Sequence, residues 1–363
     1  MTEPSPEYDV VRLAAASPFG DAEAVALGAL LRTDLDWEKL YAEAVHHRLQ
    51  ARLYVRIQQY RDVEAVGLKR LTNTLQQAVT GQVALSLFLT SEMAHLARAL
   101  HAASIPYLVL KGPSLAEAYG GIGSRPFVDN DLLIRRADFD RADDVFLAAG
   151  FQRTAKPPGR LAGYLYIHGE VTYGRQVSGQ ISTLDVHTAL VPPGMSYGET
   201  FASLHGRSRP MRVGGVDVPI LSWEDLLTAL AINGLKDHWS RLRLVGDVAA
   251  VVPFVSDWDA LLGRAQKAGA LRAVHLALLL AANEAHAVLP PAVLRQAQAD
   301  GRAADLAQWL GTYLRGLTTN GLMDLRSRAR LTLRVQDGLL GQLKYSAFVL
   351  LRRVTERYVD STE

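Results

Sequence analysis

The stretch RPFVDNDLLI, residues 125–134, decides the fold of this chain. Its last three residues, Leu132 to Ile134, form a short apolar run of the kind found in buried strands. Asp129 and Asp131 stand two residues apart at the start of that run, and side chains two apart on a strand point to one face. We therefore expect a strand over residues 129–134 that carries two carboxylates side by side.

Strand and helix patterns alternate on both sides of this stretch. The apolar runs typical of strands cover residues 107–110, 164–168, 170–177 and 181–188, and the helix patterns cover residues 115–119 and 138–149. Gly150 stands where a helix that ends at residue 149 would need its closing glycine. Residues 105–220 are therefore predicted to form an α+β unit with one mixed sheet.

Helical spacing dominates the rest of the chain, over residues 20–104 and again over residues 222–355. Ser222 and Asp225 are typical of a capping box at the start of the second region. We predict an N-terminal helical bundle (residues 1–104), an α+β core (105–220) and a C-terminal helical domain (221–363).

Composition sets limits on the chemistry. The chain has 363 residues, no cysteine and a formal net charge of +2. Thiolate metal sites are excluded, and the charge is too small to imply a polyanionic partner by itself. The first residues lack the apolar segment of a signal peptide, and the most apolar stretch, Val274 to Ala282, is too short to span a bilayer. We expect a cytoplasmic protein without a transmembrane segment.

The paired carboxylates suggest a metal site. Two neighbouring carboxylates repel and raise each other's pKa, and a divalent cation between them removes this conflict. Asp185 lies on another predicted strand between apolar residues, so it is the best candidate for a third ligand of two metals about 4 Å apart. Because the carboxylates repel, neutralising Asp129 or Asp131 without metal should leave stability unchanged or slightly higher. An Asp-x-Asp pair on an exposed strand without any function is the competing interpretation.

Several motifs in order resemble the uncharacterised nucleotidyltransferase family of the polymerase-beta-like nucleotidyltransferase superfamily. They are Asp36-Trp37, His47-Arg48, Leu110-Lys111-Gly112, Tyr119, Arg125-Pro126, Asp129-Asn130-Asp131-Leu132-Leu133, Leu184-Asp185-Val186-His187, the segment from Lys236 to Leu242 with Asp247, and Asp257-Trp258 with Arg264-Ala265. The resemblance covers most of residues 30–290. Asn130 departs from the pattern, because an apolar residue usually stands there, and its buried side chain will need hydrogen-bond partners.

The resemblance implies metal-dependent transfer of a nucleoside monophosphate from a nucleoside triphosphate to a hydroxyl of an acceptor that it does not identify, with release of pyrophosphate. The catalytic and metal-binding residues would be Asp129, Asp131 and Asp185, which would hold two Mg²⁺ ions, or Mn²⁺ in their place. Lys111, Gly112, Ser114, Arg125, Lys236 and Arg243 would bind the nucleotide. Lys111 could instead be a solvated lysine, and Arg125 could form a structural salt bridge to one of the two paired aspartates.

Weaker signals leave alternatives open. Lys236, Trp239, Arg243 and Asp247 would share one face if they lay on a single helix, either at the cleft or as an ordinary surface. His187 could relay a proton or be structural. Basic residues recur near the C-terminus around the apolar run Val349 to Leu351: Arg326, Arg328, Arg330, Arg334, Lys344, Arg352, Arg353 and Arg357. They fit a solvated helix face or a site for an acidic partner, so a nucleic acid is compatible but not implied. The alternative function is a catalytically inactive nucleotide- or RNA-binding module of the same fold.

Overall fold

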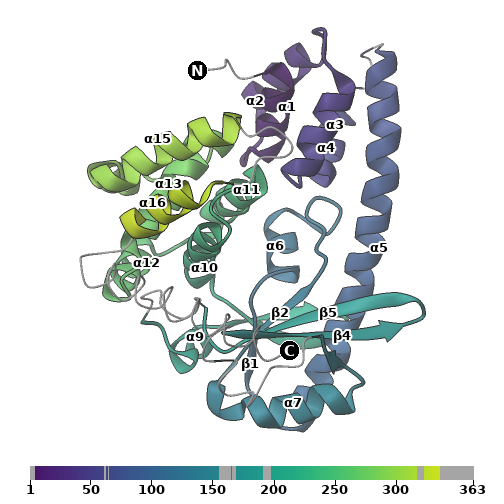
Figure 1. Cartoon of the computed structure of the whole chain (residues 1–363), viewed down its shortest axis with the longest axis vertical. Coiled ribbons are helices and arrows are strands. Elements are labelled where there is room, and N and C mark those ends of the chain that lie inside the picture. Colours follow the sequence, from purple (N-terminus) through teal and green to yellow (C-terminus); the bar gives the residue numbers. More distant parts are fainter. Residues whose placement is uncertain are drawn as a thin grey trace.

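The computed structural model describes residues 5–60, 63, 65–154, 165, 169–190, 198–316 and 323–335. It confirms an α+β fold in which a mixed sheet is flanked by N-terminal and C-terminal helices (Figure 1). The N-terminal helices are α1 (Pro6–Ala15), α2 (Asp21–Leu30), α3 (Trp37–His46), α4 (Gln50–Ile57) and α5 (Val66–Ala102). Local sequence sets several of these starts: the Asp36 carboxylate, for example, accepts hydrogen bonds from the backbone N–H groups of Glu38 and Lys39 at the start of α3.

Seven strands form one sheet in the order β3-β4-β5-β2-β1-β7-β6. They are β1 (Tyr107–Val109), β2 (Asn130–Ile134), β3 (Gln152–Arg153), β4 (Glu170–Val177), β5 (Gln180–His187), β6 (Arg209–Val213) and β7 (Val216–Ile220). The connections include α6 (Pro113–Ala118), a 3₁₀ turn (Arg136–Asp138), α7 (Phe139–Ala148) and α9 (Phe201–Gly206). The strand expected at residues 164–168 lies outside the described residues, apart from Leu165. The sheet is mixed, because β2 pairs parallel with β5 and antiparallel with β1.

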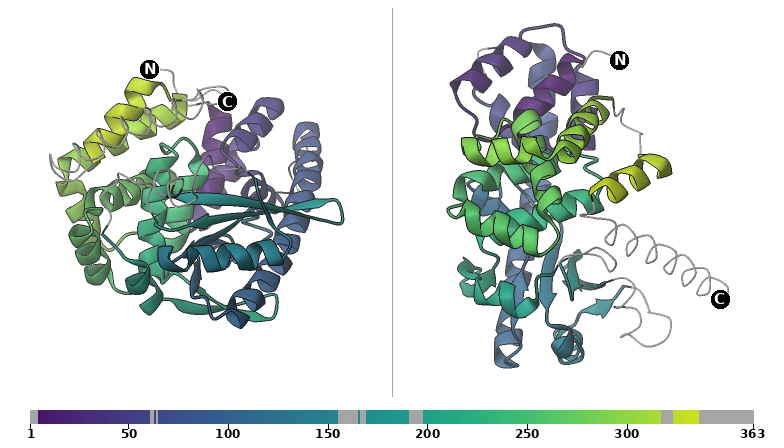
Figure 2. Two further views of the ribbon diagram at one scale, coloured as in Figure 1. Left: turned by 60° about the horizontal axis from the view of Figure 1, so that its bottom comes forward. Right: turned by 90° about the vertical axis from the view of Figure 1, so that its left-hand side faces the viewer.

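The C-terminal part is helical as far as it is described. Its elements are α10 (Trp223–Lys236), α11 (Leu242–Val251), a 3₁₀ turn (Val252–Phe254), α12 (Trp258–Lys267), α13 (Leu271–Ala285), α14 (Pro291–Ala299), α15 (Gly301–Gly316) and α16 (Leu325–Val335). Helix α1 packs against α11 and α13, so the N-terminal helices and the described C-terminal helices share one hydrophobic core (Figure 2). The boundaries at residues 104 and 220 coincide with changes between helix and strand, but the division into three domains stays a prediction.

The two faces of the sheet bury different partners. Tyr107, Leu132 and Ile134 belong to a core that includes residues of α5 and α7. Leu108 and Leu133 point the other way, into the core that includes α6, α10 and α11. Side chains alternate along a strand, so residue 131 shares the face of Leu133 and points toward this second group of helices.

Helix α5 is the one helix among the described residues that is long and apolar enough to cross a membrane by length and composition. Its two ends pack within the fold, since Leu71 and Leu75 join one core and Met93 and Leu96 join the other. A core helix of a folded protein passes the same test of length and composition.

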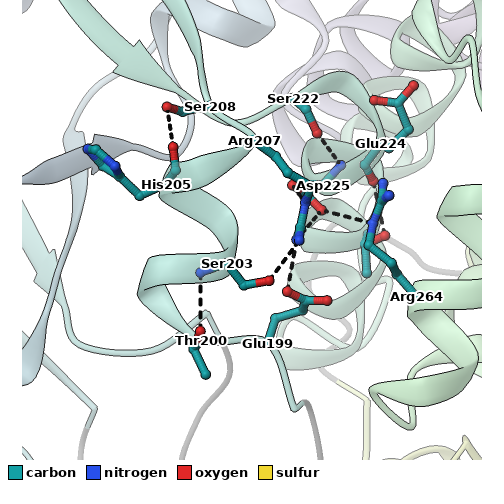
Figure 3. Close-up of polar contacts among 11 residues, drawn as sticks. Glu199, Thr200, Ser203, His205, Arg207, Ser208, Ser222, Glu224, Asp225 and Arg264 are labelled. Carbon is teal, nitrogen blue, oxygen red and sulfur yellow. Dashed lines mark hydrogen bonds and ion pairs between the residues drawn. The ribbon is translucent and has the colours of Figure 1, made fainter.

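Figure 3 shows a polar network that connects α10, which carries Asp225, to the end of α9 and to α12. The Arg207 guanidinium contacts both carboxylate oxygens of Asp225, at 2.9 and 3.1 Å, and Arg264 lies 3.7 Å from the same carboxylate. The Ser222 hydroxyl accepts a hydrogen bond from the Asp225 backbone N–H, as expected for the start of α10. The reciprocal half of the predicted capping box is absent from α10, because the Asp225 carboxylate binds Arg207 instead.

Replacing Asp225 by asparagine should lower the free energy of unfolding by about 1–3 kcal/mol, because the buried end of this network loses the charge that faces Arg207. Urea denaturation measures the change. Asp217→Asn is the matched control, since Asp217 pairs with Arg212 on an exposed surface and should change stability by less than about 1 kcal/mol. Equal losses in the two variants would contradict a structural role for the network.

Candidate functional site

The candidate site is built on two neighbouring parallel strands in the middle of the sheet. Asp131 on β2 lies directly opposite Asp185 on β5, and Asp129 comes just before β2 begins. Because neighbouring strands are about 4.8 Å apart and paired residues point the same way, Asp131 and Asp185 lie side by side on one face. The predicted strand is therefore confirmed, with β2 starting one residue later than expected, whereas the shared face of Asp129 and Asp131 stays a prediction because Asp129 lies outside the strand.

The carboxylates do not have equal surroundings. Asp131 is 3% exposed, and its Oδ1 lies 3.1 Å from Lys111 Nζ and 3.3 Å from His187 Nε2. Burial disfavours its charged form, but these two partners outweigh burial and hold the pKa of Asp131 below its usual range. Burial and the charge of Asp131 together raise the pKa of Asp129, which Lys111 only partly offsets. Asp131 therefore raises the pKa of Asp129, while Lys111 lowers the pKa of both carboxyls.

Asp185 has one hydrogen-bond donor of its own. The Thr172 hydroxyl on β4 donates to Asp185 Oδ1 at 2.6 Å. Burial raises the pKa of Asp185, the Thr172 hydrogen bond lowers it, and the nearby Asp131 raises it again, so the pKa is raised overall. A carboxylate with a raised pKa is a stronger proton acceptor than an exposed aspartate.

His187 links the carboxylates to a second acid. Its Nδ1 lies 3.2 Å from Glu170 Oε2, while its Nε2 faces Asp131. Lys236 Nζ contacts the same Glu170 oxygen at 2.9 Å. A chain of contacts therefore runs from Asp131 through His187 and Glu170 to Lys236, so Lys236 is linked to Asp131 only through two other side chains.

A cavity of about 490 Å³ opens beside the carboxylates, between the sheet and both helical parts. We call it the central cavity. Asp129 and Asp131 line it, whereas Asp185 lies next to Asp131 on the neighbouring strand and does not. Its charged lining comprises Arg48, Arg52, Lys111, Arg125, Asp129, Asp131, Asp237, Arg243 and Asp247. Of the residues predicted to bind nucleotide, Lys111, Gly112, Arg125 and Arg243 line the cavity, and Ser114 and Lys236 do not.

Gly112 shapes the loop between β1 and α6. Its φ of +69° lies in the left-handed region, and a Cβ there would approach the Phe127 ring to 3.4 Å. The Ser86 hydroxyl fixes Phe127 in turn, because it bonds both the N–H and the C=O of that residue at 2.8 Å. Ser114 is fully buried in α6, and its hydroxyl has no hydrogen-bond partner in the structure. Gly112 therefore lines the cavity in a conformation that favours glycine, whereas Ser114 is buried and does not line it.

The Arg125 guanidinium is bound to a carboxylate of the protein itself. Its Nε and Nη2 contact the two carboxylate oxygens of Asp247 at 2.7 and 2.8 Å, and its Nη1 donates to the Pro126 carbonyl. Both side chains are buried. Burial opposes the charge on Asp247, but Arg125 outweighs it and lowers the pKa of that carboxyl. The salt bridge considered for Arg125 exists, with Asp247 on α11 as its partner and neither of the paired aspartates.

Residues 236–247 do not form a single helix, so the condition under which Lys236, Trp239, Arg243 and Asp247 would share one face is not met. Helix α10 ends at Lys236 and α11 begins at Leu242, and the turn between them places His238 and Trp239 at φ of 55° and 50°. Trp239 is fully buried and packs against Gly234, so it cannot present an aromatic face to a ligand. Arg243 and Asp247, both on α11, do line the cavity.

Arg48 and Arg52 are lining residues that sequence reasoning did not assign to the site. Arg48 belongs to a motif of the resemblance, but helical spacing gave no indication that the N-terminal bundle closes the cavity. Asn130 behaves as predicted in part: its amide donates to the Leu89 carbonyl at 3.0 Å, and its own carbonyl oxygen has no partner in the structure.

The carboxylates supply the right atoms for a hard divalent ion, because oxygen ligands suit Mg²⁺ and Mn²⁺. Among the residues that the structure describes, no three carboxylate or imidazole groups are spaced to hold a metal as they stand. Lys111 supplies positive charge at Asp131, where a metal would otherwise do so. The donor chemistry therefore fits a divalent ion, and the two-metal spacing stays a prediction.

Part of the basic C-terminal segment can be described. Arg326, Arg328, Arg330 and Arg334 lie on α16, where Arg328 bonds the Met323 carbonyl and Arg330 lies over the Trp309 ring. Lys344, Arg352, Arg353, Arg357 and the run Val349 to Leu351 lie outside the described residues. An acidic partner for this segment stays a prediction.

Comparisons with known proteins agree with the sequence resemblance. The model of a family described as uncharacterised nucleotidyltransferase matches residues 33–284. No curated protein matches the chain significantly. Among solved structures, an antigenic nucleotidyltransferase-like protein from Paracoccidioides brasiliensis is similar, with 16% identity, a TM-score of 0.36, and coverage of 61% of this chain and 92% of that one. A likeness this remote carries no argument about activity.

Proposed function

This chain belongs to the uncharacterised nucleotidyltransferase family, and on that premise we propose that it transfers a nucleoside monophosphate from a nucleoside triphosphate to an acceptor hydroxyl. The family itself indicates a nucleotide substrate and a nucleotidyl-transfer role in general terms. The observation that carries the finer proposal is the joint placement of Asp131 and Asp185 on adjacent strands, with Asp129 and Lys111 beside a cavity. The acceptor is not specified by this site.

The proposed reaction is an in-line displacement. The acceptor oxygen attacks the α-phosphorus and forms the new O–P bond, while the bond to the β-phosphate oxygen breaks and pyrophosphate leaves with that electron pair. Asp185 would take the proton of the hydroxyl, since its raised pKa favours protonation. Gly112 would let the phosphates approach the backbone, because it has no side chain.

Positive charge in the site would stabilise the transition state. Lys111 would neutralise the phosphates, and Asp129, Asp131 and Asp185 would hold Mg²⁺ or Mn²⁺. The bound ion would supply Lewis-acid charge to the phosphate oxygens. Arg243 lines the cavity without an ion pair among the described residues, so it can contact a nucleotide, whereas Lys236 is held by Glu170. Arg125 would act by positioning the loop before β2, because Asp247 occupies its guanidinium.

Adding Mg²⁺ and the correct triphosphate should raise the melting temperature, because a ligand that binds only the folded state stabilises it by mass action. The gain is about 2.7 kcal/mol at a ligand concentration of 100 Kd. Differential scanning fluorimetry with each of the four ribonucleotides measures it. Pyrophosphate release in the presence of a lysate of the source cell then tests for turnover and supplies candidate acceptors.

The two measurements separate the proposal from its alternative. A thermal shift together with pyrophosphate release supports transfer. A shift without release, whatever the acceptor mixture, would favour a catalytically inactive nucleotide-binding module. No shift with any ribonucleotide at millimolar concentration would contradict nucleotide binding, and steeply salt-dependent RNA affinity would then favour the RNA-binding alternative.

A further inference from the structure

The wall of the central cavity opposite the carboxylates is made by the N-terminal helices. Arg48 and Arg52 reach the cavity from the start of α4 and the turn before it. Arg52 is 7% exposed, yet its Nε has no hydrogen-bond partner, and only its Nη2 donates, to the Ala16 carbonyl at 2.9 Å. Burial lowers the pKa of Arg52, an effect that Tyr119 and Asp247 only partly offset. A buried guanidinium that lies 4.6 Å from the centroid of the Tyr119 ring and keeps one N–H without an acceptor therefore borders the cavity.

Arg243 faces the same space from α11. Its Nε is buried and also lacks a hydrogen-bond partner. Burial and the positive charges of Arg125 and Arg48 lower its pKa to about 10, although Asp247 acts in the opposite direction. Buried polar groups are normally hydrogen-bonded, so a buried guanidinium nitrogen without an acceptor suggests that a bound ligand supplies one.

The protein's own carboxylates neutralise this wall only in part, although Asp129 and Asp237 also line the cavity and Asp129 and Asp247 act electrostatically on Arg243. Asp247 is engaged through both oxygens by Arg125, and Asp131 is engaged by Lys111. Within the described residues, Arg48, Arg52 and Arg243 form no ion pair. Among the charged residues that line the cavity, five are basic and four are acidic, so the lining keeps a net positive charge.

The start of α4 adds to this positive potential. Gln50 and Ala51, in its first turn, line the cavity, and Leu49 at the N-cap has no side-chain acceptor for their N–H groups. The first N–H groups of a helix and its dipole together favour an anion. Two independent features, unpaired arginines and an uncapped helix start, therefore point at one region.

We propose that Arg48, Arg52 and Arg243, with the first turn of α4, form an anion subsite that binds the phosphate groups of a ligand and does so without a divalent metal. We call it the arginine subsite. Phosphate suits it best, because a guanidinium binds phosphate oxygens through paired N–H donors, and several negative charges are needed to match three arginines. The phosphates could belong to the donor triphosphate or to a phosphorylated acceptor. The inference requires binding alone, so it does not depend on nucleotidyl transfer.

The test measures the affinity of the full chain for inorganic tripolyphosphate in EDTA by isothermal titration calorimetry. Wild type should bind, and Arg48→Gln and Arg243→Gln should each weaken the affinity about tenfold or more, because each removes charged hydrogen bonds to phosphate. Arg48 is exposed, so its variant should fold even if a change at the buried Arg52 prevents folding. Arg70→Gln, an exposed arginine on α5 that does not line the cavity, is the matched control.

Adding ATP in EDTA identifies the source of the phosphates. If ATP competes with tripolyphosphate, the arginine subsite takes the donor's phosphate chain. If both bind together, it takes the phosphate of a second ligand, and either result supports the subsite. No binding by wild type, unchanged affinity in both arginine variants, or an equal loss in Arg70→Gln would overturn it. Phosphate binding without pyrophosphate release would refute only the transfer reaction, and transfer with an unchanged KM in the arginine variants would refute only the subsite.

Discussion

Replacing Asp131 by asparagine should reduce the rate of nucleotidyl transfer by at least about a hundredfold, comparable to the loss of a preorganised electrostatic group. The same change should lower the free energy of unfolding by about 1–3 kcal/mol, because Lys111 and His187 lose the charge that they contact. The carboxylate of Asp131 has a lowered pKa in the folded protein, so its contribution to stability is present at neutral pH. It should be lost as the pH falls through the acid range.

Asp129→Asn should reduce the rate equally but should not lower stability. Among the described residues, Asp129 has no hydrogen-bond or ion-pair partner that its removal would strand. Its pKa is raised by burial and by Asp131, so the charged form is disfavoured in the folded state, and a neutral amide relieves that penalty above the raised pKa.

Urea denaturation without metal, beside pyrophosphate release with Mg²⁺, measures both effects in the two variants. Asp217→Asn, on the exposed surface of β7, is the control and should leave rate and stability near those of wild type. Near-normal turnover of either folded variant would show that the aspartates are part of the scaffold, and the catalytic proposal would be wrong.

The difference between these two variants marks a limit of sequence reasoning. Repulsion between neighbouring carboxylates was visible in the spacing of Asp129 and Asp131, and it predicted the same stability effect for both. The strand and its face were predictable, because the apolar run fixes a period of two. The two aspartates differ because Lys111, on the loop after β1, and His187, on β5, contact Asp131 and not Asp129. No local sequence pattern predicts which of the two carboxylates these side chains contact.

Long-range packing also explains the other failures. Helical spacing continues through residues 236–247, and Trp239, which adopts a left-handed conformation beside His238, is not a residue type that predicts one. The partner of Arg125 is 122 positions away along the chain. The arginine subsite joins α4 to α11, and only the shared core of the two helical parts brings these helices to one cavity.

Breaking the ion pair between Arg125 and Asp247 should lower the free energy of unfolding by about 3–5 kcal/mol, because removing one partner leaves an uncompensated charge in a buried place. Arg125→Gln and Asp247→Asn are the single variants, measured by urea denaturation. Replacing both residues by leucine should recover much of the loss, because neither residue of the pair then leaves its partner's charge buried alone. A double variant as unstable as the sum of the single changes would contradict coupling between the two side chains.

Phosphate affinity distinguishes this role of Arg125 from the direct nucleotide contact that the sequence suggested. Three of its donors are already used within the protein, so Arg125→Gln should act mainly on stability. Arg243→Gln should do the reverse, since it removes a half-buried cation without an ion pair among the described residues and deletes a donor of the arginine subsite. Its stability should be unchanged or higher, while tripolyphosphate binding weakens. If Arg125→Gln instead keeps wild-type stability and loses tripolyphosphate binding, Arg125 contacts the ligand directly, and Asp247 releases it to do so.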